Sequence, residues 1–205
     1  LTLLGGDFGK GVGMMLAQDD SATGREMPLE SFSRLGVAIP SVRERIASYT
    51  EYSRSDAAAV LGPLAKGVVR VGATTLEHTL FMNRGTRFEA KALPAEAQRA
   101  TAMSVVVADF DGDGREDLFL GQNFFPTEIG TMRFDAGAGL VLRGDGTGGF
   151  AALGVRESGV SVLGDQRGAA VADFDGDGRV DLAVAQNGSL TRLFRNTTGA
   201  VGVRV

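Results

Sequence analysis

Eight aspartates stand in two short runs whose spacing suits a cation site. The runs DFDGDGRED and DFDGDGRVD lie 64 residues apart, and their aspartates are Asp109, Asp111, Asp113, Asp117 and Asp173, Asp175, Asp177, Asp181. Two carboxylates ~4 Å apart repel by roughly 4 kcal/mol at an effective dielectric near 20, so a closed loop of this kind needs a counter-ion. Calcium takes carboxylate and carbonyl oxygens at alternating positions. The sequence therefore predicts two structural Ca²⁺ sites.

The segments beside the loops distinguish this site from an EF-hand. Glycine at the sixth position, Gly114 and Gly178, allows the same sharp turn, but an EF-hand closes with a glutamate at position twelve, where this chain has Leu120 and Val184. Short apolar segments at 104–108 and 118–121 predict strands around the first loop. We predict strand–loop–strand calcium turns, completed by the backbone carbonyls of Arg115 and Arg179. The alternatives are a hydrated acidic turn without metal and an EF-hand-like sensor.

Composition excludes several classes of protein. The chain has 205 residues, 43% of them hydrophobic and 22% charged, which is typical of a globular fold. The formal net charge of −4 would be neutralised by two Ca²⁺ ions, and without a basic surplus nucleic-acid binding has no electrostatic support. No apolar run is long enough for a membrane span. The absence of cysteine excludes disulfides, thiol catalysis and thiolate metal sites.

A hairpin pattern is also repeated. The segments 80–88, 141–150 and 193–199 place Asn-x-Gly, Asp-Gly or a similar turn after an apolar run. Together with the acidic loops, they form a unit of four strands: strand, calcium loop, strand, connection, strand, hairpin turn, strand. A four-stranded unit that recurs along a chain is typical of a β-propeller.

Residues 10–78 do not fit this unit, and their spacing predicts helices. Pro28 to Gly36 has a helix-like pattern with proline at its start and glycine at its end. Val42 to Tyr52 has apolar residues near helical spacing. Ser55-Asp56 is expected to cap a third short helix that runs through Leu61 and ends at Gly62-Pro63. We predict a small helical insert between the second and third strands of a blade.

The acidic loops and the four-strand period resemble the FG-GAP/VCBS-repeat propellers, which are related to the heads of integrin α-subunits. The segments 122–125, 135–140 and 143–146 resemble the bacterial long-repeat members. The resemblance implies an all-β fold with a small helical insert: a partial β-propeller of about three four-stranded blades in an incomplete ring. We divide the chain into 1–9 (end of a first blade), 10–78 (insert), 79–140 (blade strands with the first loop) and 141–205 (blade strands with the second loop).

The resemblance also implies a function and a location. It suggests a calcium-binding scaffold for recognition or cell adhesion in an extracellular, periplasmic or cell-surface protein. Its expected partners are the remaining blades of a longer parent chain and a protein or carbohydrate ligand. An enzyme is not expected. The alternative is a propeller-based polysaccharide lyase or hydrolase with structural calcium, which would need acid/base carboxylates in a cleft.

The geometry of a meander predicts where a partner would bind. Alternate turns of an antiparallel meander lie at opposite ends, so the calcium loops and hairpin turns should share one end and the other connections the opposite end. Long loops on a rigid scaffold are frequent recognition sites. The expected partner-binding residues are Tyr49, Tyr52, Gln98, Arg99, Asn123, Phe124, Phe125, Gln166 and Arg167. The alternative is that these aromatic residues pack the insert onto the propeller.

Two features that could suggest phosphate binding or serine catalysis lack the residues or elements that these activities need. The segment 144–149 matches G-x-G-x-x-G, but residues 150–153 predict a strand where a phosphate site needs a helix. His78 is the single histidine, and the sequence has no G-x-S-x-G turn for a serine nucleophile.

Overall fold

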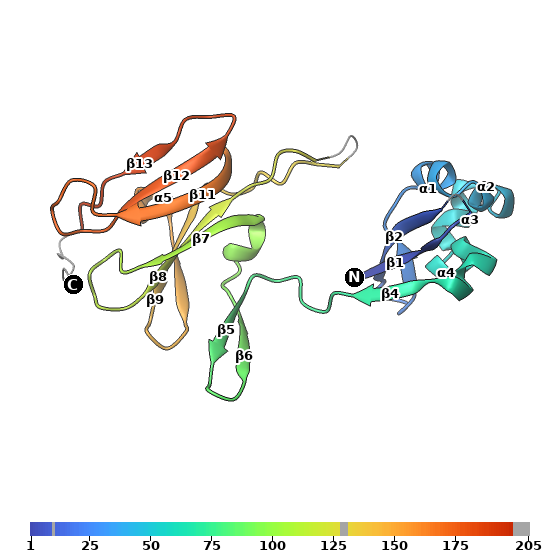
Figure 1. Cartoon of the computed structure of the whole chain (residues 1–205), viewed down its shortest axis with the longest axis horizontal. Coiled ribbons are helices and arrows are strands. Elements are labelled where there is room, and N and C mark those ends of the chain that lie inside the picture. Colours follow the sequence, from blue (N-terminus) through green and yellow to red (C-terminus); the bar gives the residue numbers. More distant parts are fainter. Residues whose placement is uncertain (10, 128–130, 199–205) are drawn as a thin grey trace. The chain divides into compact units, whose positions relative to one another are not determined.

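The computed structural model describes residues 1–9, 11–127 and 131–198. The chain divides into two units, Leu1–Leu76 and Glu77–Val205, which are described separately (Figure 1). Among the described residues, no helix combines the length and the hydropathy needed to cross a membrane.

The first unit is built on an antiparallel sheet in the order β3-β2-β1-β4. Its strands are β1 (Thr2–Asp7), β2 (Val12–Asp19), β3 (Glu26–Pro28) and β4 (Val69–Gly72). The central strand β1 pairs with β2 through Leu4↔Met15 and with β4 through Leu4↔Arg70. Residues 10–78, predicted to be a helical insert, therefore also supply three of the four strands of this sheet. Two segments of this region contain enough apolar residues to form strands, and each pairs with one edge of β1: Val12–Asp19 and Val69–Gly72.

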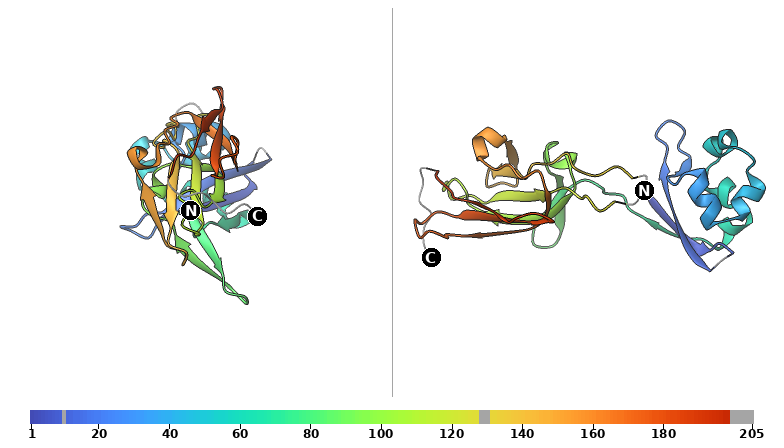
Figure 2. Two further views of the ribbon diagram at one scale, coloured as in Figure 1. Left: turned by 90° about the vertical axis from the view of Figure 1, so that its left-hand side faces the viewer. Right: turned by 90° about the horizontal axis from the view of Figure 1, so that it is seen from above.

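Short helices cover one face of this sheet (Figure 2). They are α1 (Phe32–Ala38), α2 (Ser41–Arg45), α3 (Tyr49–Arg54), α4 (Ala57–Leu61) and the 3₁₀ helix η1 (Gly62–Gly67). The predicted third helix is confirmed, with Asp56 accepting the Ala59 N–H and Gly62 at a φ of 55° after its end. The predicted helix over 42–52 is two helices, because Ser48 caps a new one.

The second unit contains one complete four-stranded meander in the order β10-β9-β8-β7. Its strands are β7 (Ala102–Ala108), β8 (Asp117–Gln122), β9 (Leu140–Gly144) and β10 (Phe150–Leu153). The first acidic loop joins β7 to β8, which confirms the strand–loop–strand prediction and excludes an EF-hand. The predicted strand over 150–153 is also confirmed.

A second sheet in this unit repeats the pattern with β11 (Asp165–Ala172), β12 (Asp181–Asn187) and β13 (Arg192–Phe194). Both sheets carry a bulge at the matching place, between Ala102 and Ser104 and between Gln166 and Gly168. A fourth strand after the predicted hairpin at 193–199 would lie outside the described residues. The predicted hairpin at 80–88 is confirmed as β5 (Thr79–Asn83) and β6 (Phe88–Ala92).

The two repeated sheets pack face to face. Phe119 of β8 and Val184 of β12 are fully buried in one cluster that also contains Leu182 and Val141. Two short helices complete the unit, η2 (Ala97–Arg99) before β7 and α5 (Val155–Ser158) between the sheets. The chain is thus mainly β with a few short helices, and none of the sheets of the described residues closes on itself. This confirms the predicted class, a partial propeller-like fold.

Candidate metal centres

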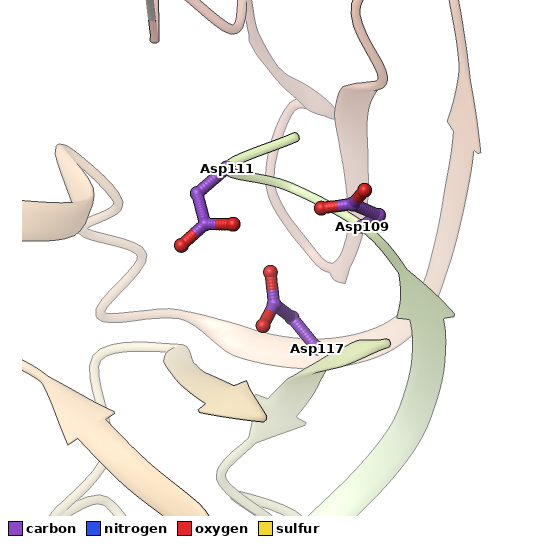
Figure 3. Close-up of side chains that lie close together, drawn as sticks. All are labelled: Asp109, Asp111 and Asp117. Atoms are coloured by element: carbon purple, nitrogen blue, oxygen red, sulfur yellow. The ribbon is translucent and has the colours of Figure 1, made fainter. Parts of the chain in front are cut away.

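The first acidic loop brings three carboxylates together. One carboxylate oxygen from each of Asp109, Asp111 and Asp117 lies within 4.8 Å of the other two. Figure 3 shows their side chains, which enter a common space from the end of β7, the loop and the start of β8. Four strand pairs from Val105↔Leu120 to Ala108↔Asp117 hold the two ends of the loop in register.

Backbone N–H groups fix the loop around Asp109. Its Oδ1 accepts hydrogen bonds from Gly112 at 2.7 Å and Asp113 at 3.1 Å, and its Oδ2 accepts one from Gly114 at 2.9 Å. Gly114 has a φ of 82°, which favours glycine and agrees with the sharp turn expected at the sixth position. The run of aspartates and glycines therefore folds back on its first carboxylate.

Asp117 is the buried member of the group, only 2% exposed. Its Oδ2 accepts the Phe110 N–H at 2.9 Å and its Oδ1 accepts the Gly144 N–H at 2.8 Å. Burial raises the pKa of Asp117, the charges of Asp111 and Asp109 add to this effect, and the two N–H donors oppose it. A carboxylate in this position is electrostatically unfavourable until a cation offsets the neighbouring charges.

The donor set fits calcium. Ca²⁺ binds oxygens at about 2.3–2.6 Å, so oxygens on opposite sides of one ion lie roughly 4.6–5.2 Å apart. The three carboxylate oxygens of the first loop lie within 4.8 Å of one another, so all three could contact one Ca²⁺ ion. Hard carboxylate oxygens without histidine or cysteine favour calcium or magnesium over zinc or copper. A loop that supplies most ligands from its own chain favours calcium over magnesium, which prefers to keep several waters.

The second loop gathers Asp173, Asp175 and Asp177 in the same way. It differs from the first loop because arginines pair with its clustered carboxylates, whereas Arg115 in the first loop pairs with Asp113, which lies outside the cluster. Arg179 Nη1 lies 2.8 Å from Asp177 Oδ2, and Arg195 forms ion pairs with both Asp175 and Asp177. The Arg179 N–H, followed by the Arg179 and Arg195 side chains, lowers the pKa of Asp177. These guanidinium groups therefore pair with two of the carboxylates that a cation in this loop would also bind.

Not every predicted ligand joins its group. Asp113 lies outside the first cluster and accepts the Arg115 N–H at 2.9 Å. Asp181 lies outside the second cluster, where its Oδ2 accepts the Phe174 N–H and its Oδ1 the Asn196 N–H. The roles of Asp113, Asp181 and the Arg115 and Arg179 carbonyls as ligands stay predictions.

Two residues that the sequence analysis did not identify bind the acidic loops. Gly144 and Asn196 occupy equivalent places, because Leu142 pairs with Leu118 and Phe194 pairs with Leu182 in matching registers. Each donates its backbone N–H to the last aspartate of the adjacent loop. In the first sheet this confirms that the acidic loop and the hairpin turn lie at the same end. Alignment of the repeated hairpins would have identified both residues.

Two of the predicted partner-binding residues are wrong because they are fully buried. Asn123 has a φ of 83°, its Nδ2 donates to Gly137, Leu163 and Gly164 carbonyls, and its Oδ1 accepts the Gly137 N–H. Gln166 donates its Nε2 to the Val162 carbonyl at 2.7 Å. Both side chains therefore hold connections between strands and cannot contact a partner at the surface.

The remaining residues predicted to bind a partner are partly or fully exposed, and most have internal contacts. The Arg167 guanidinium lies 4.7 Å from the centre of the Phe124 ring, and the Arg133 guanidinium lies 3.9 Å from that of Phe125. Gln98 Nε2 donates to the carbonyls of His78 and Leu93, whereas Arg99 is exposed. Their role in binding stays a prediction.

In the first unit, both tyrosines contact α1. Phe32 lies 5.2 Å from the ring of Tyr49 and 5.2 Å from that of Tyr52. The Tyr52 hydroxyl donates to the Glu30 carbonyl at 2.6 Å, while Tyr49 shares a 2.5 Å hydrogen bond with Ser33. These contacts support packing within the helical part and leave recognition by the tyrosines as a prediction.

His78 also has backbone partners. Its Nδ1 lies 2.9 Å from the Ala97 carbonyl oxygen, and its Nε2 accepts the Ala102 N–H at 3.3 Å. The ring thus joins the start of β5 to η2 and to the first residue of β7, which is a structural role.

Comparison with known families agrees with the repeats seen in the fold. The family model for the FG-GAP repeat matches residues 101–142 and 167–203. The two matches contain the two acidic loops, the strands β7, β8 and β12, and most of β11. No curated protein matches the chain.

Proposed function

We propose that this chain, which carries two FG-GAP repeats, is a calcium-stabilised propeller segment that serves as a recognition scaffold in an extracellular, periplasmic or cell-surface protein. The observation that carries the proposal is the convergence of Asp109, Asp111 and Asp117 at the junction of β7 and β8. These residues join two strands of one blade, so an ion there acts on the sheet itself.

The role proposed for the ion is structural. When bound, Ca²⁺ supplies positive charge that offsets the repulsion among the carboxylates. The remaining contacts come from the chain itself. Asp109 accepts hydrogen bonds from backbone N–H groups of the turn, and Asp117 accepts one from Gly144, which links the loop to the hairpin turn. The loop and both neighbouring strands should therefore gain stability together.

Recognition is assigned to the opposite end of the sheets. There the connection from β8 to β9 spans 123–139, whereas the connection from β12 to β13 spans only 188–191. The long connection carries Phe124 and Phe125, both partly exposed and both covered by an arginine. A variable connection on a rigid sheet is a suitable surface for a protein or carbohydrate ligand.

Thermal unfolding with and without calcium tests the proposal. Purified protein stripped with a chelator should melt at a lower temperature than protein with millimolar Ca²⁺, because only the folded chain assembles the sites. Asp109→Asn should lose most of this difference. Asp135→Asn is the matched control, since Asp135 is an exposed aspartate outside both loops. Equal melting temperatures in chelator and Ca²⁺ for metal-free protein would refute the structural role.

A further inference from the structure

One asparagine contacts both metal loops. Asn196 follows β13, and its Nδ2 donates to the Phe110 carbonyl at 2.7 Å and to the Val180 carbonyl at 3.1 Å. Phe110 stands between Asp109 and Asp111 of the first loop, and Val180 directly precedes Asp181 of the second. We infer that Asn196 couples the two loops, so that a cation in one raises the affinity of the other. This inference rests on the proposed calcium function.

At the first loop, the peptide groups of Phe110 are held on both sides. Its N–H donates to Asp117 Oδ2 at 2.9 Å, and its carbonyl accepts from Asn196 Nδ2 and, at 3.3 Å, from Thr198 Oγ1. Phe110 lies between two of the clustered aspartates and binds the third. The orientation of its backbone therefore affects all three carboxylates of the first loop.

At the second loop, Asn196 and its neighbour contact three of the four aspartates. The Asn196 N–H donates to Asp181 Oδ1 at 2.7 Å. The preceding residue, Arg195, forms ion pairs with Asp175 and Asp177. A cation that binds these carboxylates competes with the Arg195 guanidinium for them. This competition takes place one residue before Asn196, whose side-chain amide holds the Phe110 carbonyl.

The expected coupling is positive. An ion held by Asp173, Asp175 and Asp177 would order the second loop as a whole. Because Asp181 at the end of this loop binds the Asn196 N–H, the Asn196 side chain that holds Phe110 would become more ordered too. The first loop would then lose less conformational freedom when it binds its own ion. Linkage makes the effect reciprocal, so an ion in the first loop must favour the second by the same factor. One neutral hydrogen bond corresponds to about a two- to tenfold change in affinity.

The chain itself suggests the variant. The residue equivalent to Asn196 in the preceding blade is Gly144, which keeps the N–H bond to its aspartate and has no side chain. Asn196→Gly therefore removes the bridge to Phe110 and leaves the bond to Asp181. Asn187→Ala is the matched control, because Asn187 donates to Asp165 in the same sheet, outside both metal loops.

Calorimetric titration with Ca²⁺ in a double-mutant design tests the coupling. Asp175→Asn, which disables the second loop, should weaken binding to the first loop by about two- to tenfold in the parent protein and in Asn187→Ala. The same substitution should leave first-loop affinity unchanged in an Asn196→Gly background. Circular dichroism checks that each variant is folded, and Asn196→Ala replaces Asn196→Gly if the latter is not.

The outcomes separate the two proposals. Two ions that bind the parent protein independently, or an equal loss of affinity with and without the Asn196 side chain, would overturn the coupling and leave the calcium sites standing. A parent protein that binds no Ca²⁺ would instead overturn the proposed function, and the coupling with it.

Discussion

The backbone N–H of Gly144 donates a 2.8 Å hydrogen bond to Oδ1 of Asp117, which joins the hairpin turn of a blade to its acidic loop. A Cβ atom at Gly144 would lie 2.1 Å from the Glu116 carbonyl oxygen. Gly144→Ala should therefore destabilise the protein by about 1–3 kcal/mol, the usual cost of overpacking. Denaturant unfolding measures this change. Gly168→Ala is the control, since its nearest contact would be at 3.9 Å, and an equal loss in both variants would contradict the steric explanation.

Arg195 should compete with the cation in the second loop. Arg195→Gln removes two ion pairs to the loop carboxylates, and exposed ion pairs contribute about 0.2–1 kcal/mol each. Calcium affinity of the second loop should rise by about two- to thirtyfold, as measured by titration calorimetry. Arg143 occupies the equivalent place beside the first loop and forms no ion pair among the described residues. Arg143→Gln should therefore change the calcium affinity of the first loop little. Equal changes in both variants would point to net charge alone.

The stability of the protein should depend on both the backbone conformation and the side chain of Asn123. Asn123→Ala leaves the buried partners of the amide unpaired and places alanine at a φ of 83°, so we expect a loss of about 3 kcal/mol or more. Asn123→Gly loses the same bonds without the backbone strain and should be more stable than the alanine variant by about 1 kcal/mol. Chemical unfolding of both variants tests this order. An alanine variant as stable as the glycine variant would show that strain is absent.

Tyr52 should make the first unit sensitive to alkali. Burial, together with the charge of Glu30, raises the pKa of the Tyr52 hydroxyl to about 12. In the unfolded chain the hydroxyl ionises near pH 10, so the unfolded state loses its proton first and stability falls as pH rises from about 10 towards 12. Tyr52→Phe should reduce this loss in pH-dependent unfolding. Tyr49→Phe is the comparison, and a steeper alkaline loss in Tyr52→Phe than in the parent protein would contradict the sign.

The parts that could be predicted from sequence are those in which chemistry and structure lie within one short segment. Asp109 to Asp117 carries its own turn, so the alternation of aspartate and glycine was enough to predict a loop between two strands. Asp56 likewise stands three residues before the N–H that it caps. The repeated turns at 84–87 and 145–149 gave the hairpins for the same reason.

The parts that could not be predicted depend on contacts between distant segments. Asn196 bonds to a carbonyl 86 residues away, and no local pattern indicates this partner. From the sequence, Asn123 is expected at the surface because it follows a strand. In the folded chain it is buried, because its side chain binds the backbone at residues 137, 163 and 164. Val69–Gly72 forms a strand because it pairs with one edge of β1, and the paired residues are more than sixty positions apart in the sequence.

The separation of the two ends of the blade has an evolutionary consequence. The first connection between middle strands, 123–139, is far longer than the second, 188–191, yet both loops keep the same run of aspartates and the same hydrogen bond from the hairpin. A longer connection at one end of the sheet therefore leaves the acidic loop at the other end unchanged. If the proposed recognition role holds, such an arrangement would let new binding specificities arise without changes to the part that stabilises the fold.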